Sequence, residues 1–68
     1  MFPNLLGQKA YHRMTNEDMA KVIGVNRATY ESKIKSGRFT IEEGRAYSRF
    51  FKKDFDYLFA LNEPTRTA

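Results

Sequence analysis

Residues 15–34, TNEDMAKVIGVNRATYESKI, predict a short helix that ends at a glycine turn. Thr15 and Asp18 stand three residues apart, the spacing of a capping box, in which each side chain accepts a hydrogen bond from the other residue's backbone N–H. Gly24 adopts a positive φ at little steric cost, so the helix can end there.

The same stretch predicts a second helix over residues 27–35, with Asn26 as its N-terminal cap. Ala20 lies four residues before Gly24, on the side of the first helix that faces the second. A side chain larger than methyl at this position would push the two helix axes apart. Alanine and glycine therefore stand where two helices must nearly touch.

We expect three further helices outside this pair. The first begins at about Asn4, which would cap it, and Thr40 with Glu43 forms a second capping box before the fourth helix. Asp54 would cap a short fifth helix over 55–61. Because no stretch sustains the alternating pattern of a strand, the sequence predicts an all-α fold.

Apolar residues at three- and four-residue intervals mark the faces that we expect to be buried. They are Leu5, Leu6, Ala10, Met19, Val22, Ile23, Ile41, Tyr47, Phe50, Phe51, Phe55 and Phe59. Gly44 interrupts the fourth helix at a cost of about 1 kcal/mol relative to alanine. This glycine indicates either a close crossing of two helices or a tolerated defect.

A chain of 68 residues can form one hydrophobic core, so we expect a single compact domain over 1–61. Residues 62–68, which include Pro64 and two threonines, are expected to form a flexible C-terminal tail. The chain has no cysteine, which excludes a disulfide framework and a thiolate zinc site. No stretch resembles a signal peptide or reaches the ~20 apolar residues of a membrane span. We therefore expect a cytoplasmic protein that has no membrane partner.

Six phenylalanines and four tyrosines are more than one small core needs. We expect Tyr57 and Phe50 to be partly exposed together with Leu61, although Phe50 also falls on the apolar side of its helix. These three residues would form an apolar patch near the C-terminal end of the domain. The patch is a candidate surface for a second subunit, which would make a homodimer, or for another protein.

The net charge of +4 is concentrated on the predicted helix pair. Residues 21–38 carry five basic residues and one acid, Glu31, whereas five basic and five acidic residues balance from position 39 onward. A concentrated positive surface attracts the DNA backbone through the release of counterions. The alternative is an ordinary solvated face of a helical domain.

Enzymatic chemistry has little support in the sequence. His12 has no cysteine or second histidine to work with. Two pairs of acids, Glu17 with Asp18 and Glu42 with Glu43, stand in the first turns of helices, where capping and the helix dipole account for them. We therefore expect neither an enzyme nor a bound metal or cofactor.

The helix pair resembles the lambda-repressor-like helix-turn-helix family, the Cro and cI type common among small phage regulators. The resemblance covers roughly residues 4–60, and two departures from the family pattern are Asn16, usually a glutamine, and Tyr30, usually a small aliphatic residue. The residues that carry it are Ala20, Gly24, Val25, Asn26, Arg27, Ala28, Thr29, Lys33, Ile34, Phe39, Thr40, Ile41, Glu42 and Glu43. It implies a compact five-helix DNA-binding domain.

The resemblance also implies which side chains meet DNA when helix 27–35 enters the major groove. The base edges would be contacted by Arg27, Ala28, Glu31 and Ser32. Phosphates would be held by Thr15, Asn16, Asn26, Lys33 and Lys35. Arg27 could pair with O6 and N7 of guanine, and Ala28 could touch a thymine methyl group. The expected function is that of a sequence-specific transcriptional regulator of Cro-type repressor kind, with a double-stranded operator as its partner.

A function of a different class is also compatible with the sequence. A protein-binding modulator, such as an antirepressor, would use the same helical fold to bind a phage repressor protein. Ala28 is an apolar residue at the exposed start of its helix, and the aromatic C-terminal end could also dock against a protein. Fold alone does not decide between these functions.

Overall fold

Five helices make up the computed structural model, which describes residues 2–61. They are α1 (Pro3–Tyr11), α2 (Asn16–Ile23), α3 (Arg27–Ser36), α4 (Ile41–Phe51) and α5 (Phe55–Leu58). Residues 2–61 contain no strand, so the all-α prediction is confirmed. The predicted flexible tail, 62–68, lies outside the described residues.

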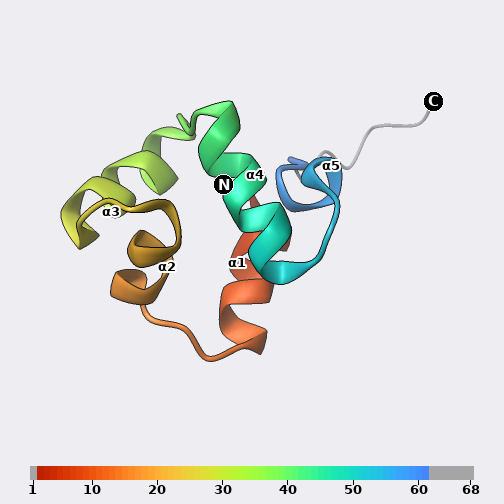
Figure 1. The fold of residues 1–68 in the computed structure, drawn as a ribbon, viewed down its shortest axis with the longest axis horizontal. Helices are drawn as coiled ribbons and strands as arrows, with labels where there is room; N and C mark the ends of the chain where they lie inside the picture. The colour runs from red at the N-terminus through yellow and green to blue at the C-terminus, as the bar shows by residue number, and fades with distance from the viewer. Residues whose placement is uncertain (1, 62–68) are drawn as a thin grey trace.

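Helices α3 and α5 lie at opposite ends of the described part of the molecule (Figure 1). Helix α4 runs through the middle, and α2 lies below α3 in this view. α3 packs chiefly against α2, whereas α5 packs against α4 and α1.

Both predicted capping boxes are present. The backbone N–H of Asp18 donates to Thr15 Oγ1 at 3.0 Å, and the Thr15 N–H donates to Asp18 Oδ2 at 2.9 Å. The hydrogen bond from the Thr15 N–H is the main reason why the pKa of Asp18 lies below its usual value. The second capping box starts α4: the Glu43 N–H donates to Thr40 Oγ1 at 3.1 Å, and the Thr40 N–H donates to Glu43 Oε1 at 2.9 Å. Local sequence therefore sets the starts of α2 and α4.

The turn between α2 and α3 is also as predicted. Gly24 has φ 77°, and the N–H of Val25 donates to the Ala20 carbonyl at 3.0 Å. Asn26 caps α3, because its Oδ1 accepts the Thr29 N–H at 2.8 Å. Ala20 is only 1% exposed. The two helices therefore meet closely over a methyl group.

A buried core joins all five helices to Phe2, which precedes α1. Tyr47 of α4 lies at its centre, and its hydroxyl donates to the Met19 carbonyl of α2 at 2.8 Å. Burial is the main reason why the pKa of Tyr47 is raised. The core residues are Phe2, Leu5, Met19, Ala20, Tyr30, Tyr47, Phe51 and Leu58.

The start of α1 corrects the predicted cap. The helix begins at Pro3, and Phe2 rather than Asn4 takes the cap position, with φ 57°. Phe2 is buried because its ring packs edge-on against Phe59 at 5.1 Å between centroids. The Asn4 side chain instead donates to the Tyr57 carbonyl at 2.8 Å, which ties α1 to α5.

Helix α5 is shorter than predicted and ends at Leu58. The Tyr57 carbonyl, which would accept the Leu61 N–H in a longer helix, already accepts the Asn4 side chain and the Ala60 N–H. Asp54 stands at the N-cap but makes no side-chain capping hydrogen bond. The tertiary contact with α1 therefore limits the helix.

Several residues predicted to be buried are exposed. Leu6 is 37% exposed, Ile41 66% and Phe55 39%, and Ala10 is also exposed. Leu6, Ala10 and Ile41 do not belong to the core cluster, whereas the ring of Phe55 packs on Gly44 of α4 and is only partly covered by it. Phe50, for which the sequence indicated both a buried face and partial exposure, is 53% exposed.

Gly44 marks a close crossing, which was one of its two predicted interpretations. It is buried in α4, and a Cβ built on it would collide with the ring of Phe55. The Phe55 ring of α5 therefore rests directly on the backbone of α4.

Candidate nucleic-acid interface

Helix α3 has a buried side and an outward side. Tyr30 is 1% exposed and Ile34 is half-buried, four residues further along the same side. The side chains that face outward include Arg27, Ala28 and Ser32, all exposed. Because α3 lies at the end of the molecule, this outward side is unobstructed by the other described helices (Figure 1).

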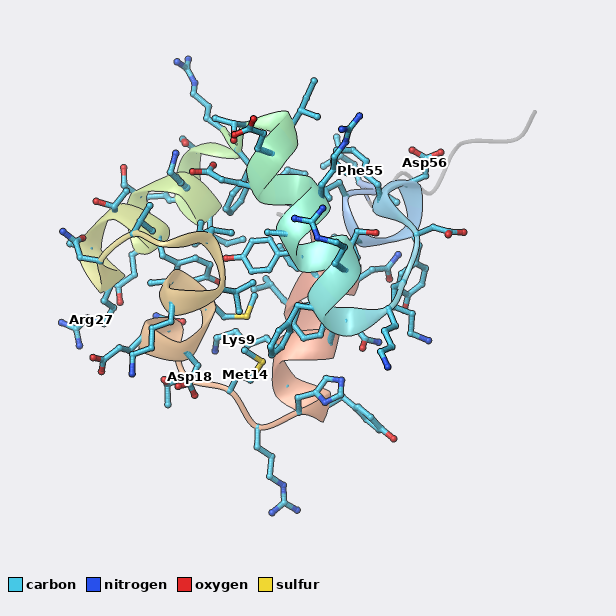
Figure 2. The ribbon with its side chains drawn as sticks, in the orientation of Figure 1. Lys9, Met14, Asp18, Arg27, Phe55 and Asp56 are labelled. Carbon is cyan, nitrogen blue, oxygen red and sulfur yellow. The ribbon has the colours of Figure 1, made fainter. Side chains whose placement is uncertain are left out.

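Glu31 links the outward side of α3 to the start of α2. Its Oε2 accepts a hydrogen bond from Asn16 Nδ2 at 3.0 Å and lies 3.6 Å from Arg27 Nε. Arg27 extends away from the body of the protein (Figure 2), with 67% of its side chain exposed against 45% for Glu31. The contact with Glu31 is through Nε, and the described residues give the two terminal nitrogens of the guanidinium no hydrogen bond or ion pair.

Two lysines expected to hold phosphates differ in their surroundings. Lys33 Nζ lies 3.3 Å from Glu43 Oε1, and these side chains are only 23% and 15% exposed. Lys35 is exposed, and neither ion pair within residues 2–61 involves it. Lys33 therefore joins α3 to α4, whereas Lys35 is available to an anion.

The remaining predicted phosphate contacts already serve the local fold. Thr15 takes part in the capping box, the Asn16 amide donates to Glu31, and Asn26 Oδ1 caps α3. The start of α2 still presents backbone N–H groups, which attract anions. A depression of about 450 Å³ adjoins it, and Lys9 of α1 contributes to its lining. Lys9 was not predicted here, because only the tertiary fold brings α1 to this point.

A second depression, of about 470 Å³, follows the other flank of α3. No acidic residue lines it; the lining residues are Asn26, Ala28, Thr29, Ser32, Lys33, Ser36 and Arg38. Arg38 is exposed and was not predicted as a contact. Gly37, with φ 77°, ends α3 and turns the chain so that the Arg38 N–H donates to the Lys33 carbonyl at 3.2 Å. Gly37 is the feature of the sequence that could have placed Arg38, because a glycine that ends a helix fixes where the next residue lies.

Tyr30 fills the space between α3 and the core. Its hydroxyl is buried and has no hydrogen-bond partner among residues 2–61. Burial, and secondarily the nearby Glu31, raise the pKa of this phenol. A large aromatic residue at this position therefore fits the fold but leaves one polar atom unsatisfied.

The predicted apolar patch is exposed at all three positions: Phe50 53%, Tyr57 43% and Leu61 53%. Phe50 borders a depression between α2 and α4, while Tyr57 belongs to α5. These residues are therefore on different elements of the fold.

No group of three metal-ligating side chains occurs among the residues that the structure describes. None of the five described helices is both long and apolar enough to cross a membrane. Comparisons of the chain with protein-family models, curated proteins and solved structures found no match.

Proposed function

We propose that this protein is a sequence-specific double-stranded DNA-binding regulator of transcription, in which α2, the glycine turn and α3 act as a helix-turn-helix of the lambda-repressor-like kind. The observation that carries the proposal is the division of α3 into a side anchored by Tyr30 and an outward side with Arg27, Ala28 and Ser32. An α-helix fits the major groove of B-DNA, which is about 12 Å wide.

Arg27 is the principal candidate for reading a base. Its Nε faces Glu31 and its side chain extends away from the body of the protein (Figure 2), so its terminal nitrogens could donate together to O6 and N7 of one guanine. Glu31 is itself held by Asn16, which reduces the freedom of the pair before DNA binds. Ala28 and Ser32 stand one turn apart on the adjoining stripe, close enough to contact neighbouring bases.

Phosphates would be held on either side of the inserted helix. Lys9 lies beside the N-terminus of α2, and Arg38 lies beside the depression along α3. Lys35 is exposed in the last turn of α3. The proposal therefore assigns phosphate contacts to Lys9, Lys35 and Arg38, and gives Lys33 a mainly structural role through Glu43.

Selection from a library of random duplexes, followed by affinity measurements, tests this function. Arg27→Ala should weaken the free energy of binding to the selected duplex by about 1–3 kcal/mol. The loss on random DNA should be much smaller, because a guanine contact discriminates between sequences. Lys35→Ala should weaken binding to the selected duplex and to random DNA equally. It should also reduce the magnitude of the slope of log affinity against log salt by about one.

A selection that enriches no sequence would count against this function. The protein-binding modulator would replace it if, in addition, Arg27→Ala or Ala28→Glu abolished the capture of a phage repressor while no duplex was bound. The same exposed helix would then serve a groove on a protein.

A further inference from the structure

A depression of about 690 Å³ lies between α2 and α4, and no residue of α3 lines it. Its size is in the range of pockets that bind compact ligands or protruding side chains. Its apolar lining residues are Met14, Val22, Ala46 and Phe50, and its charged ones are Asp18, Lys21 and Arg49. Phe50 is the large apolar side chain that the fold leaves exposed here, at 53%.

The charged rim of this depression favours an acidic occupant. The Asp18 carboxylate is occupied, since it accepts the Thr15 N–H at 2.9 Å in the capping box of α2. Lys21 and Arg49 are exposed, and the two ion pairs within residues 2–61 do not include them. Lys21 nevertheless lies near enough to Asp18 to help lower the pKa of that carboxyl, so Arg49 is the cation with no acidic neighbour on this rim. An apolar floor whose rim carries two cations against one carboxylate suits a partner that offers an exposed aromatic side chain next to a carboxylate.

The chain itself carries such a segment at residues 54–57, Asp-Phe-Asp-Tyr. Asp54 and Asp56 are exposed, and the ring of Tyr57 is 43% exposed. The segment is also held in place: the Tyr57 carbonyl accepts the Asn4 side chain at 2.8 Å, and Leu58 is fully buried beneath it. A segment that is ordered before binding loses less entropy when it docks.

Figure 2 shows that Phe55 and Asp56 lie at the α5 end, whereas Met14 and Asp18 lie beside α2, away from it. The segment therefore does not meet the depression within one molecule. We propose that residues 54–57 of a second copy of this chain occupy the depression between α2 and α4, so that copies associate head to tail.

The two surfaces of this contact are different, so each bound copy still offers one free depression and one free segment. Such a heterologous contact extends into a chain of copies unless its rotation closes a ring. The contact is small, so association should be weak and visible only at high protein concentration. The outward side of α3 takes no part in it, and the inference does not rest on the proposed DNA-binding function.

Sedimentation analysis of two variants tests the proposal. Arg49→Glu should damage the depression by placing like charges together, and Tyr57→Ser should remove the aromatic anchor of the segment. Each variant alone should associate about tenfold or more weakly than the unaltered protein, whose mean mass should rise with concentration beyond that of a dimer. Arg45→Glu, an exposed substitution four residues earlier in α4 that does not line the depression, is the matched control.

A mixture of the two variants gives the decisive measurement. The intact segment of the Arg49→Glu protein can enter the intact depression of the Tyr57→Ser protein, and no further copy can add to either. The mixture should therefore form a dimer and nothing larger, while circular dichroism confirms that both variants are folded. The proposal is overturned if the unaltered protein keeps a constant monomer mass, if it stops at a dimer that neither substitution weakens, or if the folded variants fail to pair when mixed.

Discussion

Helix α3 and helix α5 occupy opposite ends of the molecule and are held there in different ways (Figure 1). In the ten residues of α3 only Tyr30 is fully buried. Two partly buried polar links, from Asn16 to Glu31 and from Lys33 to Glu43, supplement it. In contrast, the four residues of α5 depend on aromatic packing, with Phe55 over Gly44.

This difference teaches which end can vary without loss of the fold. The outward side chains of α3 contribute little to packing, and exposed ion pairs contribute about 0–1 kcal/mol. A helix of four residues is too short to be stable alone, so α5 exists only through its tertiary contacts. The end with the exposed helix is therefore free to carry function, whereas the aromatic end is tied to stability.

The largest effect is expected at the joint that attaches α3. Ala20→Leu should destabilise the protein by about 2 kcal/mol or more, because the added atoms wedge α2 and α3 apart. For a domain of this size the loss corresponds to a fall in melting temperature of about 10 °C. Ala28→Leu, the same change at an exposed position of α3, is the control and should alter the melting temperature little. Equal melting temperatures for the two variants would contradict the close packing at Ala20.

High pH should weaken the core that connects the two ends. Tyr47 and Tyr30 have raised pKa values in the folded protein, mainly through burial. Above pH ~10 the unfolded chain loses these protons while the folded protein keeps them, so stability should fall by up to ~1.4 kcal/mol per pH unit for each tyrosine. Urea unfolding between pH 8 and 11 measures the slope. Tyr47→Phe should make the slope shallower, because one of the two buried phenols is then absent. An unchanged slope in this variant would contradict the assignment to Tyr47.

The hydroxyls of the two buried tyrosines should have opposite effects on stability at neutral pH. Tyr47→Phe removes the hydrogen bond to the Met19 carbonyl and should cost about 1 kcal/mol. Tyr30→Phe removes a buried hydroxyl that has no partner among the described residues, so it should be neutral or stabilising by up to ~1 kcal/mol. Denaturant unfolding of both variants measures the difference. A clear loss of stability in Tyr30→Phe would show that its hydroxyl has a partner after all.

The smallest effect separates the two lysines of α3. Lys33→Gln should lower the free energy of unfolding by about 0.5–1 kcal/mol, because it breaks the partly buried pair with Glu43. Lys35→Gln should leave that free energy unchanged within about 0.5 kcal/mol. The proposed DNA binding should rank the two variants the other way. Lys35→Gln should reduce the slope of log affinity against log salt more than Lys33→Gln does. If Lys33→Gln produced the larger loss, Lys33 would have to leave Glu43 for a phosphate.

The sequence alone determined the features that depend on neighbours three or four residues apart. Thr15 with Asp18, Thr40 with Glu43, and the glycine turn at Gly24 all appear in the structure as predicted. Such caps and turns are satisfied within one helical turn, so no distant residue can easily override them. The starts of α2, α3 and α4 follow from the same local signals.

Only the tertiary structure decided burial and pairing between distant residues. Phe2 entered the core and Asn4 left its predicted cap because both contact residues near position 58, more than fifty places along the chain. The exposure of Ile41 and the engagement of Lys33 by Glu43 likewise depend on which elements happen to face each other. Periodicity shows that a helix has an apolar side, but the free energy of burial is gained only where another element covers that side.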